Sequence, residues 1–248
     1  MEDKVKKIFL IIIIVCSGHI AFAQTPFKQN NTFDIALSAG LSEFMGALSW
    51  SQVHGVTKND KFKLGYGVRL NYYAGNQQLF TTAPAKLTSK KTGPQIFFSP
   101  IFNENIDTIT PVGKFGMGSI NAAIYMQYDF NEKWAVGFNI DAAGLSFGGD
   151  IDAHVISSSA PPEANKIEVA RPTVGNLLLI SDNDVGMLNS ELSGMYRFNN
   201  QMSIRLGFSF LFTEYTTINT LPYNFANDRF RHKSLMGMVG FSYRPFDK

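Results

Sequence analysis

The chain has almost no cysteine and, beyond its first residues, no long apolar run. Cys16 is the only cysteine among 248 residues, so an intramolecular disulfide is excluded. After residue 23 the longest aliphatic run is 177–180, far short of the roughly 20 apolar residues that a membrane-spanning helix needs. The net charge of +2 gives no electrostatic basis for binding nucleic acid. If the chain crosses a membrane, it therefore does so with strands.

The first residues predict an export signal that is removed. A basic head with three lysines precedes an apolar stretch of eight residues at 8–15, and small residues follow at Ala21 and Ala23. A signal peptidase reads small residues at these two positions, so we expect cleavage before Gln24. The predicted organisation is a signal peptide over 1–23, a short periplasmic segment over 24–32 and a β-barrel domain over 33–248.

Apolar and polar residues alternate with period two in eight segments. The clearest is 202–214, where every second residue from Met202 to Phe212 is apolar. The other segments are 33–41, 47–56, 62–73, 115–130, 134–147, 185–198 and 233–246. Tilted strands of roughly ten residues are long enough to cross the hydrocarbon layer of a membrane. The pattern predicts eight antiparallel strands.

The face opposite the apolar stripe indicates which side of the sheet is inside. It carries small residues such as Gly65, Gly67, Ala143 and Ser193 instead of long polar side chains. The lumen of an eight-stranded barrel has room only for packed side chains, so small residues belong there. We therefore expect the apolar stripe to face lipid. A secreted soluble carrier, the alternative, would turn the same stripe inward.

Charged residues of both signs share the small-residue face. We expect the following residues to form a lumen charge network: Asp34, Lys63, Arg69, Asp129, Asp141, Glu191, Arg197, Arg205 and Arg244. Such a network is either the lining of a polar pore or a paired ionic plug that satisfies buried charge. The narrow interior of an eight-stranded barrel favours the plug.

The gaps between the segments are alternately short and long. Tight polar turns are expected at 58–60, 131–133 and 199–201, and long loops at 75–114, 148–184 and 215–232. Outer-membrane barrels have short periplasmic turns and long external loops, so both termini are expected in the periplasm. Strand-like residues at 94–102, 166–170 and 176–181 leave a ten-stranded barrel as an alternative.

Aromatic residues cluster near the strand ends, as in the girdles of membrane barrels. The expected periplasmic girdle is Phe62, Tyr128, Phe130, Trp134, Tyr196, Phe198, Phe241 and Tyr243, and the expected outer girdle is Tyr72, Phe115, Phe147, Phe210 and Phe212.

The signal peptide, the strand pattern, the loop asymmetry and the aromatic segment 241–246 resemble the small outer-membrane barrels of the outer membrane protein A and X class. Phe246 departs from the terminal pattern because Asp247 and Lys248 follow it. The resemblance implies an all-β, closed, antiparallel up-and-down transmembrane β-barrel in the outer membrane of a Gram-negative cell. It implies membrane lipid, lipopolysaccharide and the outer-membrane insertion machinery as partners. It is architectural, so it transfers no functional residue.

No catalytic or metal-binding motif stands out. His54, His154 and His232 have no spacing that ties them to a nucleophile, and there is no Gly-x-Ser-x-Gly elbow. Asp150, Asp152 and His154 alternate in one loop, but such residues are usually solvated. We expect neither enzymatic activity nor a cofactor.

The long loops are therefore the remaining place for function. The stretch 86–93 is basic and could meet an anionic leaflet, although an ordinary soluble loop would look the same. We expect a structural or surface-interaction role through 75–114 and 148–184, with an extracellular partner that the sequence does not name. A narrow pore or small-solute transporter and a lipid-modifying enzyme are the alternatives.

Overall fold

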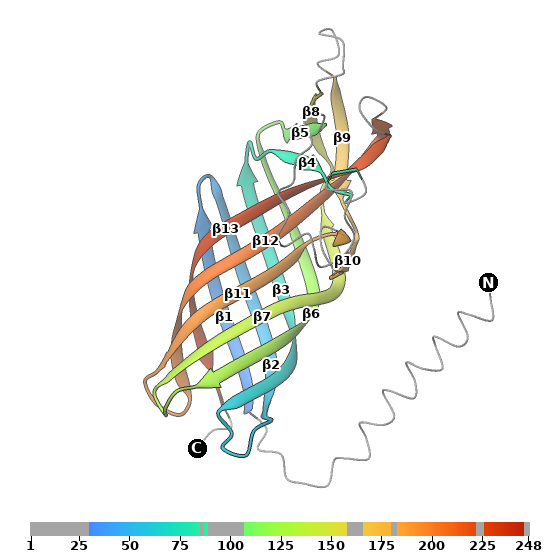
Figure 1. Cartoon of the computed structure of the whole chain (residues 1–248). Coiled ribbons are helices and arrows are strands. Elements are labelled where there is room, and N and C mark those ends of the chain that lie inside the picture. Colours follow the sequence, from blue (N-terminus) through green and yellow to red (C-terminus); the bar gives the residue numbers. More distant parts are fainter. Residues whose placement is uncertain are drawn as a thin grey trace, which may run out of the picture.

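The computed structural model describes residues 30–84, 87–88, 107–157, 166–179, 183–221 and 226–245 (Figure 1). The expected signal peptide, most of the segment 24–32, most of the basic stretch 86–93, the strand-like segment 94–102 and Phe246 lie outside these residues. Within the described ranges every named element is a β-strand, and no helix there is long and apolar enough to cross a membrane.

Eight long strands pair in a closed ring. They are β1 (Asn30–Gly40), β2 (Glu43–Gly55), β3 (Phe62–Asn76), β6 (Lys114–Asp129), β7 (Trp134–Gly148), β11 (Leu188–Arg197), β12 (Met202–Leu221) and β13 (Asn227–Tyr243). Each of these strands is antiparallel to the next, and β13 also pairs with β1, which closes the main ring. The strands are tilted around a common axis (Figure 1).

Five short strands lie at the end of the main ring away from the start of β1 (Figure 1). They are β4 (Phe80–Thr82), β5 (Thr108–Pro111), β8 (Ile151–Ile156), β9 (Ile167–Pro172) and β10 (Gly175–Leu177). The pairings run β13–β4–β5–β8–β9–β12, so four of the short strands close a second ring with the β12–β13 hairpin. β10 pairs instead with β7. The two rings are thus joined through one shared hairpin.

The predicted total of eight strands, or ten as the alternative, is not confirmed, because the sheet has 13 strands within the described residues. The additional strands lie in 75–114 and 148–184, which were expected to be loops. The expected loop 215–232 is largely strand as well, since β12 continues to Leu221 and β13 begins at Asn227. Thr216, Thr217 and Ile218 in this region are β-branched, and β-branched residues favour extended backbone.

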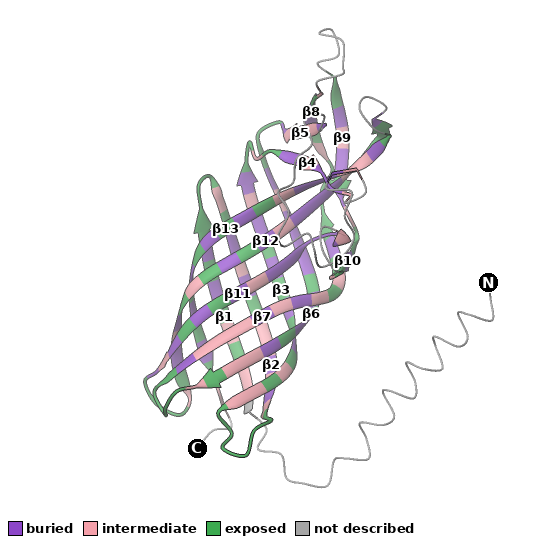
Figure 2. Cartoon of the chain, in the orientation of Figure 1, coloured by how far each residue is buried: buried purple, intermediate pink, exposed green. Residues whose placement is uncertain are grey.

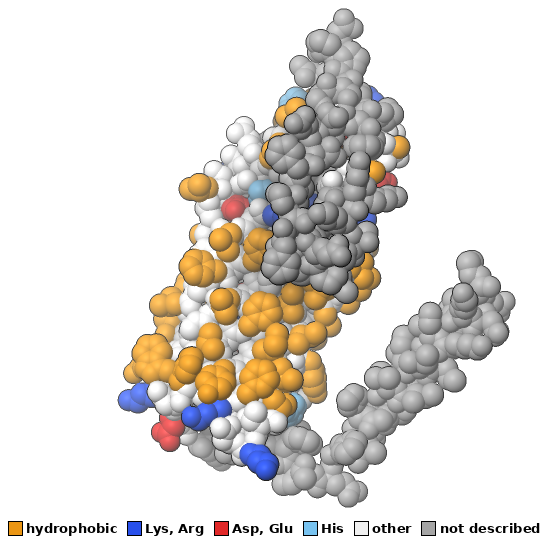
Figure 3. Space-filling view, in the orientation of Figure 1, with side chains coloured by type: hydrophobic (Ala, Val, Ile, Leu, Met, Phe, Trp, Pro, Cys, Tyr) orange, Lys and Arg blue, Asp and Glu red, His pale blue; other side chains and the backbone are white. Residues whose placement is uncertain are grey.

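The apolar stripes of the main ring point outward. In β1, Phe33, Ile35 and Leu37 are exposed, whereas Ala36 and Ser38 on the opposite face are buried. The same alternation marks the other long strands (Figure 2), and hydrophobic side chains cover the visible wall of the main ring (Figure 3). The small side chains fill the interior, where the crossing strands leave little room.

A bulge in β7 changes which residues face the interior. The register of β6 and β7 shifts at this point, so that Ala142 is an extra residue. Before the bulge, odd-numbered residues such as Asn139 are buried. After the bulge, the odd-numbered Ala143 and Phe147 are exposed. Ala143 was predicted to face the lumen, and this prediction is wrong because a bulge reverses the alternation of a strand.

Two tight turns at the opposite end of the main ring share one hydrogen-bonding pattern. The side-chain oxygen of Asn131 accepts hydrogen bonds from the backbone N–H groups of residues 133 and 134 at 2.9 Å. Asn199 does the same for residues 201 and 202 at 2.8 Å. A short polar side chain that mimics a backbone turn explains why these connections are brief.

Candidate functional site

Arg69 from β3 is the centre of the polar interior. Its Nε and Nη2 atoms donate to Oδ1 of Asp141 at 2.8 and 2.6 Å, and its Nη1 atom lies 3.3 Å from Oε1 of Glu191. Nη2 also donates to the carbonyl oxygen of Asn189 at 2.6 Å. The Arg69 side chain is 1% exposed, so its charge depends on these protein partners instead of on water.

The second oxygen of Asp141 is saturated by amide groups. It accepts hydrogen bonds from Nδ2 of Asn71 at 3.1 Å, from Nδ2 of Asn121 at 2.8 Å and from the backbone N–H of Asn189 at 2.9 Å. A fully buried carboxylate is stable only when it is paired and hydrogen-bonded in this way. The bulge next to Asp141 sets the position of this residue at the end of the inward-facing run of β7.

Glu191 from β11 connects Arg69 to a second arginine. Its Oε2 atom lies 3.2 Å from Nη1 of Arg205. The Nε atom of Arg205 in turn lies 3.2 Å from Oδ1 of Asp34, which also accepts a hydrogen bond from the Ser242 hydroxyl. The charge chain therefore runs Asp141–Arg69–Glu191–Arg205–Asp34 and links β7, β3, β11, β12 and β1 across the lumen.

A second charge cluster lies near the tight turns. Asp129 at the end of β6 forms ion pairs with Lys63, at 3.0 Å, and with Arg197. Eight of the nine charged residues expected in the lumen thus form ion pairs with one another. The ninth, Arg244, lines a small cavity of about 40 Å³ together with Lys63 and Arg205. A cavity of this size holds a few water molecules.

An apolar layer fills the lumen at the end near the second ring. Phe80 from β4 is fully buried, with ring centroids 5.5 Å from Phe115 and 5.3 Å from Tyr215. Met45 and Met117 belong to the same buried cluster. The sequence analysis missed this layer because Phe80 and Tyr215 lie in segments that were taken as loops.

Phe115 corrects one prediction for the outer girdle. It is 6% exposed and belongs to the apolar layer instead of the outer wall. The physical reason is its parity, because in β6 the odd residues Met117 and Ser119 are buried whereas Ile120 is exposed. The alternation in this strand was a sufficient signal to place Phe115 inside.

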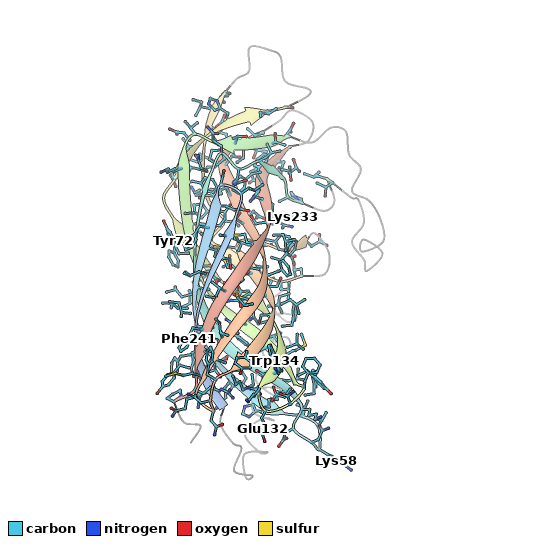
Figure 4. The ribbon with its side chains drawn as sticks, turned by 90° about the vertical axis from the view of Figure 1, so that its left-hand side faces the viewer. Lys58, Tyr72, Glu132, Trp134, Lys233 and Phe241 are labelled. Atoms are coloured by element: carbon cyan, nitrogen blue, oxygen red, sulfur yellow. The ribbon has the colours of Figure 1, made fainter. Side chains whose placement is uncertain are left out.

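The other aromatic residues expected in the girdles lie on the outer wall. Trp134 and Phe241 lie near the end with the tight turns, and Tyr72 lies near the opposite end (Figure 4). Residues that are exposed are Tyr72, Tyr128, Phe130, Trp134, Phe147, Phe198, Phe210, Phe241 and Tyr243, and those that are partly buried are Phe62, Tyr196 and Phe212. Several of these rings contact one another, as do Trp134 and Tyr196 with centroids 4.8 Å apart.

A histidine, a serine and an acidic residue meet at the rim of the main ring. Glu43 accepts hydrogen bonds from Tyr73 at 2.8 Å and from Ser234, and Nε2 of His232 lies 3.2 Å from the same oxygen. A nucleophilic triad requires the histidine between the serine and the acid, but here the carboxylate is between them. The cluster ties β2, β3 and β13 together and has no nucleophile–base pair.

The remaining histidines are separated from this cluster. The ring of His54, near the end of β2, lies 6.5 Å from that of Tyr66, and His154 is exposed on β8. Asp150, one of the three residues considered for a metal ion, lies 3.8 Å from Arg171. In the described parts of the chain, no three His, Cys, Asp or Glu side chains are grouped so as to hold a metal.

The β12–β13 hairpin carries a buried ionic cluster where the two rings join. The carboxylate of Glu214 is fully buried and pairs with Arg229 at 2.7 Å and with Arg231 at 3.1 Å. Both arginines also donate to the carbonyl oxygen of Asp184. Burial disfavours the charge on Arg229, but its hydrogen bonds with Glu214 outweigh this and hold its pKa above the ordinary value.

Among the comparisons with known proteins, the one with solved structures is the one that found similarity. No protein-family model and no curated protein matches the chain. The chain is similar to Neisserial surface protein A, with 9% sequence identity and a TM-score of 0.36 over 86% of this chain and 94% of that protein.

The chain is also similar to a Pseudomonas aeruginosa FadL homologue, with 13% identity, a TM-score of 0.25 and coverage of 82% of this chain and 68% of that chain. The Ralstonia pickettii toluene transporter TbuX is matched at 10% identity and a TM-score of 0.24, with the same coverage of each chain. The likeness to these three solved structures concerns the fold alone.

Proposed function

We propose that the protein is an integral outer-membrane β-barrel whose main ring of eight strands crosses the membrane. The observation that carries this proposal is that the main ring has an apolar outer wall around a charged interior, which is the reverse of the arrangement in a soluble protein. Leu206 and Phe208 are about 60% exposed, while Arg69 and Asp141 inside are buried. In water this arrangement would expose a continuous hydrophobic surface, whereas in lipid both faces are satisfied.

The distribution of residues along the axis supports the same orientation. Charged Lys58 and Glu132 lie in the tight turns below the aromatic residues Trp134 and Phe241 (Figure 4). Short turns belong to the periplasmic side of such barrels. The second ring then lies at the cell surface, and the long segments 75–114 and 148–184 supply β4, β5, β8, β9 and β10 to that end.

We infer that the lumen is closed to solutes. The charge chain crosses the interior at one level, and the apolar layer around Phe80 closes it at another. Eight strands enclose a space that side chains can fill completely. The protein in a planar bilayer should therefore give no single-channel conductance above the protein-free baseline, and stable conductance steps would support the narrow pore instead.

The proposed role is a structural or surface-interaction role without catalysis. The second ring presents a rigid surface outside the membrane, because its strands close on one another and share a buried core with the main ring. If the protein instead modifies lipid, cells with and without it should differ in their lipid A profile. An identical profile is the outcome expected here.

The orientation can be tested with single cysteines, because the sequence has none after residue 23. Asp152→Cys places a thiol at an exposed position of β8, and Lys58→Cys places one in an exposed tight turn at the other end. A membrane-impermeant maleimide added to intact cells should label the first variant and not the second. The opposite labelling, or a cytoplasmic fraction that contains the protein, would refute the proposal.

A further inference from the structure

The outer wall of the main ring is hollowed on one side. A groove with a volume of about 300 Å³ is lined by Phe138, Ser190, Leu192, Phe208, Phe210 and Leu235, with Glu191 contributing beneath them. The strand register brings these residues together, since Leu192 pairs with both Phe138 and Phe208, and Phe210 pairs with both Ser190 and Leu235. The groove therefore crosses β7, β11, β12 and β13 on the face that is proposed to meet lipid.

The shape of the groove follows from one small residue among large ones. Ser190 lies between Ile140 and Phe210 in the sheet, and its hydroxyl donates to the carbonyl oxygen of Phe210 at 3.4 Å. Its polarity is thereby satisfied within the backbone, and its small volume leaves a hollow between the aromatic walls. The carboxylate of Glu191 points into the lumen, where it pairs with Arg69 and Arg205, so the groove itself is apolar.

Positive charge lies directly above the groove. Lys233 pairs with Phe212. This pair lies two residues further along each strand, toward the second ring, than the Leu235–Phe210 pair that forms the groove wall. The ammonium group of Lys233 and the guanidinium carbon of Arg231 each lie 5.4 Å from the centroid of the Phe212 ring. Lys233 lies at the end of the main ring near the second ring (Figure 4). A cation held over an aromatic ring at the membrane boundary has the charge and the position to pair with the phosphate of a lipid headgroup.

We propose that this groove and Lys233 form a binding site for the lipid A part of lipopolysaccharide, with an acyl chain in the groove and a phosphate at Lys233. The site rests on the proposed membrane orientation, which puts it in the outer leaflet, where lipopolysaccharide is the phosphate-bearing lipid. The occupant follows from charge complementarity, because the cationic end is at the level of the headgroups and the apolar groove is at the level of the chains.

The test is native mass spectrometry of the full protein in detergent, titrated with purified lipid A. A complex with one lipid A molecule is expected, and lipid A without its phosphates should bind more weakly. Lys233→Gln should weaken binding about fivefold, the effect of one cation near a membrane surface. Lys58→Gln, in an exposed turn at the other end, should leave binding unchanged.

The groove has its own variant and matched control. Ser190→Phe fills the hollow and should abolish the complex. Gly46→Phe adds the same side chain to the wall on β2, where a Cβ atom meets its neighbours at 3.8 Å or more, and should have no effect. Equal binding of lipid A and its phosphate-free form, equal loss in the two Phe variants, or tighter binding of phosphatidylglycerol would overturn the proposal.

Failure of this site and failure of the proposed membrane orientation can be told apart. Each variant is first assayed for insertion, by its heat-dependent shift in gel mobility and by cysteine labelling in intact cells. A protein that inserts in the expected orientation but retains no lipid A would refute the lipid site alone. A protein that does not insert would refute the membrane proposal as well.

Discussion

Replacement of Arg69 by methionine tests whether the lumen is a dry, paired interior. The substitution removes the cation between Asp141 and Glu191, both of which are at most 2% exposed. Breaking a buried ion pair by removing one partner costs about 3–5 kcal/mol, because the remaining charge is left without compensation. The structure favours the lower part of this range, since both carboxylates keep other partners.

These remaining partners determine how much the free energy of unfolding should fall. Asp141 loses its two hydrogen bonds from Arg69 but keeps three, from Asn71, Asn121 and the N–H of Asn189. Glu191 keeps Arg205 at 3.2 Å. We therefore expect Arg69→Met to lower the free energy of unfolding by about 3 kcal/mol. Adding Asp141→Asn restores the charge balance and should recover about 1–3 kcal/mol relative to the sum of the single changes.

The assay is urea unfolding in lipid vesicles, followed through the fluorescence of the two tryptophans. Arg171→Met is the matched control, because Arg171 is 54% exposed and its partner Asp150 is 3.8 Å away. An exposed pair of this kind contributes less than about 1 kcal/mol. If Arg69→Met costs no more than this control, or if its effect simply adds to that of Asp141→Asn, the lumen is hydrated and the closed interior is wrong.

Three further predictions address the wall, the bulge and the junction of the rings. Leu206→Arg on the outer wall should destabilise the inserted protein by about 2–4 kcal/mol, whereas Leu206→Phe should change little, as measured by unfolding in vesicles. Deletion of Ala142 should remove the extra residue, leave Phe147 paired with Gly118 and facing outward, and preserve the heat-dependent mobility shift, whereas loss of the shift would contradict this reading of the bulge. Glu214→Gln should remove the buried charge that pairs with Arg229 and Arg231 and make the β12–β13 extension sensitive to protease at a concentration that spares the main ring.

Much of the main ring is readable from the sequence because its two environments differ sharply. A strand with one exposed apolar face and one face in a crowded lumen must alternate large apolar and small polar residues, so the pattern from Met202 to Phe212 identifies both the strand and its outer face. The tight turns are equally local, since Asn131 and Asn199 form them with their own neighbours. The charged residues of the lumen could be identified because they occupy the positions in each strand that alternate with the apolar stripe. Eight of them pair with one another.

Tertiary structure decided what depends on partners distant in the chain. The second ring pairs β4 with β13 and β9 with β12, contacts that no local pattern in 75–114 or 148–184 encodes. The register shift at Ala142 is likewise set by the neighbouring strand, and it reversed the facing of Ala143. Alternation by itself determined that the chain forms long strands with an apolar and a polar face. The pairing of distant segments decided the number of strands, the apolar layer that covers the charges, and the groove on the wall, because each of these depends on which strands become neighbours.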